Sequence, residues 1–141
     1  MLLPRSENAL RGVHPQLQAV VRLAAHAMQQ RTDGLGFIVT QGLRTPQQQA
    51  ELYRARATRT MDSRHLTGHA VDLAATVNGA VRWDWPLYPE LAAVMKAAAA
   101  NLGVTIYWGG DWTNFRDGPH FELNPRDYPM PAAAAAAVAA A

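Results

Sequence analysis

Apolar residues recur at helical spacing in the first part of the chain. Between residues 15 and 31 they form one stripe, because steps of four, three and four positions return to the same face of a helix. This stripe consists of Leu17, Val21, Ala24 and Met28. Pro15 suits the first helical turn, and the pair Asp33-Gly34 ends the predicted helix.

Two further helices are predicted, each opened by a proline. Thr45 before Pro46 is typical of a helix N-cap, so we expect a helix over about residues 46–57. The next helix covers about residues 86–102, and Gly103 suits its C-terminal cap. We expect its buried face to contain Leu87, Leu91, Val94, Ala98 and Leu102.

Short runs of β-branched and aromatic residues predict strands between the helices. The pair Asn78-Gly79 is a strong hairpin-turn signal and lies between two extended runs. The predicted strands cover about residues 37–40, 69–75, 80–85, 104–107 and 120–123. Helices and strands mixed in this order indicate an α+β fold, with a small antiparallel or mixed sheet and helices packed on one face.

The length of 141 residues suffices for one domain with a hydrophobic core and is too short for two. We place this domain at residues 1–130. Residues 131–141 are alanine-rich and have no apolar stripe that could be buried against a partner. We therefore expect them to form a dispensable C-terminal tail.

The charge balance is mildly basic, with 13 lysines and arginines against 11 aspartates and glutamates. Without a dense basic run, this balance argues against nucleic-acid binding. No segment approaches the roughly 20 apolar residues that span a bilayer, so we expect no membrane insertion. Residues 1–8 lack the apolar stretch of a signal peptide, so we expect synthesis in the cytoplasm and release by another factor.

The chain contains no cysteine, so any metal ion must be held by histidines and carboxylates. His65, Asp72 and His120 are candidates, because two histidines and one carboxylate form a catalytic zinc set with an open fourth position. The spacing of His65 and Asp72 is weak by itself, since a surface histidine and a capping aspartate give the same pattern. Strand alternation puts His69 on the face opposite Asp72, which disfavours it as a ligand. The histidines that we expect to be structural or solvated are His14, His26 and His69.

One string of residues favours the metal site over a surface histidine and a capping aspartate. Residues 63–72 read Ser-Arg-His-Leu-Thr-Gly-His-Ala-Val-Asp. The string resembles the Ser-x-His-x-x-Gly-x-Ala-x-Asp signature of the D-alanyl-D-alanine carboxypeptidase and dipeptidase family, which also contains the phage L-alanyl-D-glutamate endolysins. All five fixed positions of that signature are present.

Three more segments resemble the same family and follow its order. Residues 41–49 contain Gln-Gly-Leu-Arg-Thr followed by glutamines and resemble its upstream arginine segment. Residues 119–121, Pro-His-Phe, with Asp117 before them, resemble its second metal motif. Residues 108–112, Trp-Gly-Gly-Asp-Trp, resemble a segment typical of the endolysin branch. The combined likeness extends over about residues 37–123.

The resemblance implies a role for each matching residue. Asp117 would be the general base, and Arg44 would hold the substrate carbonyl or the oxyanion that develops from it. Ser63 would support the substrate or the surroundings of the metal, and Gly68 would allow the turn between the ligands. The ligands of a Zn²⁺ ion would be His65, Asp72 and His120.

Other residues near these motifs have two possible roles. Trp108 and Trp112 are equally suited to line a substrate groove or to pack in the core. Asp111 could be catalytic, but aspartate in a Gly-Gly-Asp turn commonly binds nearby backbone groups, and we favour that structural role. We expect Arg64 and Arg116 to be solvated.

The resemblance implies a zinc metallopeptidase that acts on peptidoglycan stem peptides, and within the family we favour cleavage between L-alanine and D-glutamate. The endolysin-type string, the compact domain and the expected lack of a signal peptide favour a phage or prophage lysis enzyme that reaches the cell wall after membrane permeabilisation. The nearest alternative is a D-alanyl-D-alanine carboxypeptidase or dipeptidase, because groove contacts select the bond. A non-catalytic wall-binding module would have a broken metal set, and a DNA-associated protein would have a basic cluster. We expect a monomer whose partner is its peptidoglycan substrate.

Overall fold

The sheet of the computed structural model is antiparallel and has the strand order β1-β2-β5-β4, with β3 paired to the C-terminal end of β2. The structure describes residues 2–57 and 63–129. The strands are β1 (Leu35–Gln41), β2 (Ala70–Val77), β3 (Ala80–Arg82), β4 (Ile106–Trp108) and β5 (His120–Leu123). The predicted α+β fold with an antiparallel sheet is confirmed.

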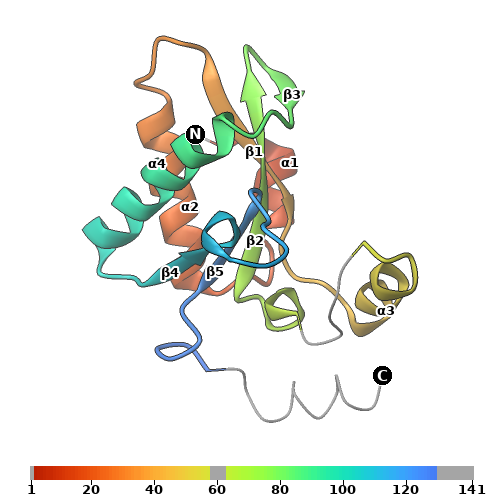
Figure 1. Ribbon diagram of the computed structural model, residues 1–141. Helices are drawn as coiled ribbons and strands as arrows, with labels where there is room; N and C mark the ends of the chain where they lie inside the picture. Colours follow the sequence, from red (N-terminus) through yellow and green to blue (C-terminus); the bar gives the residue numbers. More distant parts are fainter. Residues whose placement is uncertain (1, 58–62, 130–141) are drawn as a thin grey trace.

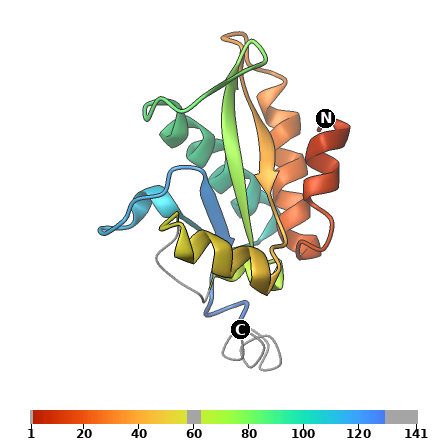
Figure 2. The ribbon, with the colours of Figure 1, turned by 90° about the vertical axis from the view of Figure 1, so that its right-hand side faces the viewer.

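The longer helices form a layer against this sheet. Helices α2 and α4 pack against each other and against one side of the strands, while α3 stands apart from that layer (Figures 1 and 2). The helices are α1 (Pro4–Ala9), α2 (Pro15–Met28), α3 (Pro46–Arg54) and α4 (Leu87–Leu102). Two short 3-10 turns are η1 (Arg64–Thr67) and η2 (Gly109–Asp111). No helix in the described ranges has the length and apolar character needed to cross a membrane.

Local sequence explains where several elements begin and end. The hydroxyl of Thr45 accepts from the Gln48 N–H at 3.1 Å, and the Gln48 side chain accepts from the Thr45 N–H at 2.9 Å, which closes a capping box at the start of α3. Asn78 and Gly79 have φ values of 51° and 86°, as a tight hairpin turn between β2 and β3 requires. Gly103 adopts a left-handed conformation and ends α4.

Alternation along the central strands separates the core from the opposite side of the sheet. Val71, Leu73, Phe121 and Leu123 are fully buried in the core with the apolar faces of α2 and α4. Because neighbouring side chains of a strand point to opposite faces, Asp72 and His120 lie on the other side of the sheet. The hydrophobic core therefore supports the sheet on one face, while Asp72 and His120 lie on the opposite face.

Several predicted details were wrong or incomplete. Helix α1 was not predicted, because a helix of six residues with no side-chain cap leaves little periodic pattern. Leu102, expected on the buried face of α4, is 44% exposed, whereas Tyr88 and Met95 are buried there. Strand β3 ends at Arg82, before the predicted residue 85. The alanine-rich tail at residues 131–141 lies outside the described residues.

Candidate active site

The structure brings His65, Asp72 and His120 together. Asp72 on β2 and His120 on β5 are direct partners in the antiparallel register, and His65 comes from the turn η1. Asp72 Oδ1 lies 3.2 Å from His65 Nε2 and 3.3 Å from His120 Nδ1. One ligand atom from each of the three residues lies within 4.8 Å of the others, so the group could hold a metal ion.

The outer nitrogens of both rings have partners that suit metal binding by the inner ones. His65 Nδ1 lies 2.9 Å from the carbonyl oxygen of Gly42, and His120 Nε2 lies 2.8 Å from Glu122 Oε1. A neutral ring that donates its outer N–H keeps a lone pair on the inner nitrogen. The donor set of two imidazoles and a carboxylate, without thiolates, fits Zn²⁺ with an open position for water or substrate.

The charged forms of Asp72 and His120 stabilise each other. Burial would lower the pKa of His120, but hydrogen bonds with Asp72 and Glu122 outweigh it and raise the pKa to about 9. Burial would raise the pKa of Asp72, but hydrogen bonds from His120 and His65 hold it well below its usual range. A metal ion at these nitrogens would compete with protons for the same lone pairs.

The turn that holds His65 depends on Ser63 and Gly68. The Ser63 hydroxyl accepts from the His65 N–H at 3.2 Å and caps η1. Gly68 ends this turn with φ of 73°, and a Cβ atom there would lie 2.3 Å from the carbonyl oxygen of Gly12. Both the backbone angle and the close approach exclude a larger residue, which accounts for the predicted structural role of Gly68.

Arg44 is fixed beside the cluster by its backbone and its side chain. A bulge at Thr40 shifts the register of β1 just before the Arg44 segment, as bulges near active sites often do. The Arg44 N–H donates to the His65 carbonyl at 2.9 Å, and Arg44 Nη1 donates to Gln49 Oε1 at 2.7 Å. Arg44 Nη2 lies 3.9 Å from Asp72 Oδ2. Burial lowers the pKa of Arg44, the charges of Asp72 and Asp117 oppose this shift, and the guanidinium stays charged.

Asp117 is held at the same site by the loop after β4. Its N–H donates to the Gly109 carbonyl at 3.0 Å, and its own carbonyl accepts from the His120 N–H at 3.2 Å. A turn therefore joins Asp117 to His120. Burial, followed by repulsion from Asp72, raises the pKa of Asp117. A carboxylate with a raised pKa is a better proton acceptor than an exposed one.

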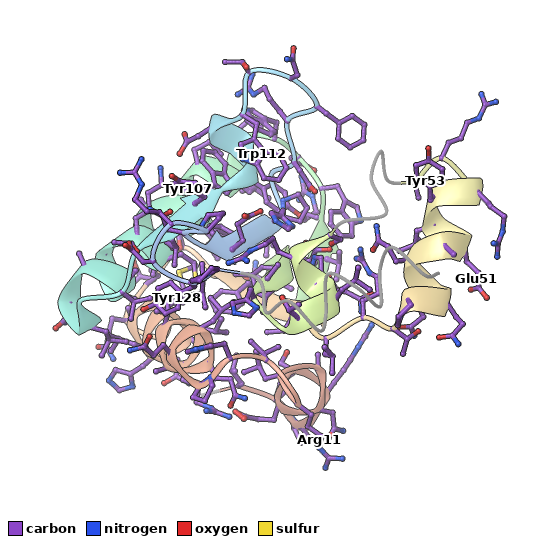
Figure 3. The ribbon with its side chains drawn as sticks, turned by 90° about the horizontal axis from the view of Figure 1, so that it is seen from below. Arg11, Glu51, Tyr53, Tyr107, Trp112 and Tyr128 are labelled. Carbon is purple, nitrogen blue, oxygen red and sulfur yellow. The ribbon has the colours of Figure 1, made fainter. Side chains whose placement is uncertain are left out.

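These side chains line one cavity of about 570 Å³. Its polar part contains Arg44, Ser63, Arg64, His65, Asp72, Asp117, His120 and Glu122. Its apolar part contains Leu52 and Ala57 near α3, and Trp112 and Phe115 on the loop after β4. Figure 3 shows Trp112 and the α3 residue Tyr53 on opposite sides of this region. The cavity is therefore a cleft between that loop and α3, with the metal cluster on one wall.

The structure distinguishes between the two roles considered for each of Trp108, Trp112 and Asp111. Trp112 lines the cavity, with its ring centre 5.1 Å from that of His120. Trp108 is buried in the core, does not line this cavity, and donates from Nε1 to the Gly118 carbonyl at 2.7 Å. This hydrogen bond holds the turn next to Asp117. Asp111 lies outside the cavity and pairs with Lys96 at 2.7 Å.

Other predictions for this region had mixed outcomes. Arg64 is not solvated, because its guanidinium is largely buried beside Glu122. Arg116 is exposed, and its guanidinium lies 4.4 Å from the ring centre of Trp85. Glu122 and Phe115 line the cavity but were not predicted as site residues. Glu122 could have been found, because it follows His120 by two positions on a predicted strand and so shares its face.

The comparisons with known proteins point to one family. The family described as phage L-alanyl-D-glutamate peptidase matches residues 2–124. The chain belongs to this family. The family suspected from the four sequence motifs is thus confirmed, and the match ends before the alanine-rich tail.

Individual members of the phage L-alanyl-D-glutamate peptidase family show the extent of the likeness. The L-alanyl-D-glutamate peptidase of Escherichia phage T5 is 32% identical over 127 residues, which cover 87% of this chain and 88% of that protein. The L-alanyl-D-glutamate peptidase of Listeria phage A118 is 35% identical over 98 residues, or 69% of this chain. That match covers only 34% of the Listeria phage protein, so this chain corresponds to about a third of it.

A solved structure is similar over nearly the whole chain. The crystal structure of the L-Ala D-Glu endopeptidase ChiX of Serratia marcescens matches with a TM-score of 0.82 and 46% sequence identity. The match covers 90% of this chain and 92% of that one. The fold described above is therefore shared with a protein that is named as an L-Ala D-Glu endopeptidase.

Proposed function

We propose that this protein hydrolyses the L-alanyl-D-glutamate bond of peptidoglycan stem peptides, with Zn²⁺ held by His65, Asp72 and His120. The observation that carries the proposal is the convergence of these three residues in one cavity with Asp117 and Arg44. The printed names of the phage and Serratia relatives support the choice of bond.

A Zn²⁺ ion at this site would polarise the scissile carbonyl and make an attacking water more acidic. Asp117 accepts the proton of that water and passes it to the leaving amine of the substrate. Burial raises the pKa of Asp117, which makes its carboxylate a better proton acceptor than that of an exposed aspartate. The turn that joins Asp117 to His120 keeps the base beside the metal ligands.

Arg44 stabilises negative charge on the substrate oxygen. Its guanidinium is held by Gln49 and lies within the cavity, so it needs little reorganisation when the oxyanion develops. Ser63 and Trp112 contact the stem peptide from the cavity wall. Trp108 contributes indirectly, through its hydrogen bond to the turn that carries Asp117.

We further propose that the protein is a phage or prophage lysis enzyme, and the phage origin of two relatives supports this assignment. A protein of this kind acts on the cell wall after its release and functions as a monomer on a polymeric substrate. A D-alanyl-D-alanine carboxypeptidase would use the same metal cluster, and so the products of digestion distinguish the two activities.

The zinc assignment is tested by metal content and by reconstitution. We expect about one Zn²⁺ per chain, loss of activity on chelation, and recovery when Zn²⁺ is returned. His65→Ala and His120→Ala should lose most of the metal, whereas the exposed His26→Ala is a matched control that should keep it. Full zinc occupancy in both ligand variants would contradict the assignment.

A further inference from the structure

Glu122 is a buried carboxylate on the strand that carries His120. The two residues are separated by one position on β5 and therefore share a face of the sheet. Across the ladder, Glu122 pairs with Ala70, whose methyl group leaves room for a larger neighbour. Glu122 is 8% exposed, and its Oε1 atom lies 2.8 Å from His120 Nε2. The carboxylate thus contacts the side of the His120 ring that faces away from Asp72.

Arg64 holds a fixed positive charge on the other side of this carboxylate. Arg64 Nη2 donates to the carbonyl oxygens of Leu123 at 3.2 Å and Tyr128 at 2.5 Å. These bonds fix the guanidinium independently of Glu122, whose Oε2 atom lies 3.9 Å from Arg64 Nε. Within the described part of the chain, that buried Nε atom has no hydrogen-bond partner.

The arrangement links two of the candidate metal ligands. Arg64 directly precedes His65 in the turn η1, and its side chain reaches the carboxylate that contacts His120. Packing alone does not account for this pair, because burying two charges that do not form a direct hydrogen bond costs free energy. Orientation of a ligand ring is a role that needs the charge, since a carboxylate holds the proton on the nitrogen that faces it.

We propose that Glu122 is a positioning residue for the metal, which fixes the rotation and the protonated nitrogen of His120, and that Arg64 holds Glu122 in place. The proposal rests on the proposed zinc site and adds residues that act through the ligand His120 and are not ligands themselves. In this role Glu122 keeps the proton on Nε2 and leaves Nδ1 free to bind. Loss of such an outer partner typically lowers metal affinity about 10–100-fold.

Zinc affinity measured by competition with a chromogenic chelator tests this role directly. We expect Glu122→Ala to bind Zn²⁺ about 10–100-fold more weakly than the wild type. Glu122→Gln keeps the size and one acceptor oxygen, so it should show a smaller loss in the same direction. Glu90→Gln is the control, because Glu90 is a half-exposed glutamate that pairs with Arg31 far from the cavity.

A second readout separates positioning from general destabilisation. In the zinc-loaded wild type, the His120 ring should show a slowly exchanging Nε2–H signal in ¹⁵N–¹H spectra, and Glu122→Ala should lose that protection. Arg64→Met should weaken zinc binding less than Glu122→Ala does, because it leaves the direct partner of His120 in place.

The outcomes distinguish this proposal from the zinc assignment itself. A wild type that binds no zinc would overturn the proposed function. Zinc binding in the wild type, with unchanged affinity and unchanged Nε2–H exchange in folded Glu122→Ala, would overturn the positioning role alone. If Glu122→Ala does not fold, the same two measurements on Glu122→Gln decide, and wild-type values there overturn the role.

Discussion

Asp117 and Asp111 lie on one loop but in different surroundings. Asp117 lines the cavity with the metal cluster, whereas Asp111 pairs with Lys96 outside it. We expect Asp117→Asn to keep its zinc and its melting temperature and to lose at least about 100-fold in activity, because only the proton acceptor is removed. The measurements are metal content, thermal unfolding and hydrolysis rate.

Asp111→Asn is the matched control for this variant. It should change stability slightly, because an exposed ion pair contributes little, and leave most of the activity. If Asp117→Asn is active and a zinc-loaded Asp111→Asn is inactive, the assignment of Asp117 as the base is wrong.

The raised pKa of Asp117 also predicts a pH dependence. Asp117 accepts a proton only when it is ionised, so kcat/KM should fall as the pH falls through its pKa. Burial, which is the largest cause, raises that pKa above the usual value of 3.8, so the fall should begin at a higher pH than for an exposed aspartate. The pH–rate profile measures this, and an identical acid limb in the residual activity of Asp117→Asn would assign the limb to another group.

Substitutions of Arg44 test how much a planar, fixed cation contributes to turnover. Arg44→Lys keeps the charge but loses the geometry that Gln49 holds, so we expect a loss mainly in kcat, by about 10–1,000-fold. Steady-state kinetics on a soluble stem-peptide substrate separate kcat from KM. Near-normal turnover in Arg44→Ala would exclude the oxyanion role.

Residues with a signature were easier to predict than residues that act through others. The positions of the three candidate ligands followed from one string and one short motif, and the structure places them together. Arg64 was expected in solvent, because nothing in its local sequence shows that Leu123 and Tyr128 lie across from it. Long-range partners of this kind depend on the completed fold.

At the level of elements, the turn between His65 and Asp72 depends on Gly68. Gly68 and Gly79 both have positive φ, but only Gly68 faces backbone atoms at close range, whereas nothing lies within 4 Å of a Cβ added at Gly79. We expect Gly79→Ala to lose about 1–2 kcal/mol of unfolding free energy from the backbone angle alone.

Gly68→Ala should lose roughly 1–3 kcal/mol more than Gly79→Ala, because the new methyl group displaces the Gly12 backbone. Urea unfolding of both variants measures the difference, and Gly68→Ala should also bind zinc more weakly. Equal stability losses would show that the close approach to Gly12 does not matter.

Elements with a local start or stop signal were predicted well. The N-cap of α3 at Thr45, the Asn78-Gly79 hairpin and the Gly103 cap all occur where the sequence indicated. Helix α1 was missed, although it supports the site. Its Ser6 hydroxyl accepts from the Val39 N–H at 3.0 Å, and the Ala9 carbonyl lies against Gly42. Such support comes from tertiary packing, which a short segment does not reveal in its own pattern.

At the scale of the whole molecule, the register of the sheet brings positions that are distant in the chain together in one site. Asp72 and His120 are partners across β2 and β5, although neither strand length nor composition specifies that pairing. The α+β class followed from the order of helices and strands. The pairing of these strands, and hence the cavity, was accessible from sequence only through the resemblance of four motifs to one family.

Digestion of purified peptidoglycan tests the central claim most directly, through mass spectrometry of the new chain ends. The proposed activity predicts free L-alanine carboxyl ends on the glycan side and new D-glutamate amino ends, produced by zinc-loaded wild type and not by Asp117→Asn. Release of D-alanine alone would identify a carboxypeptidase with the same metal site. New reducing sugar ends, or no new ends from a zinc-loaded protein, would contradict the account.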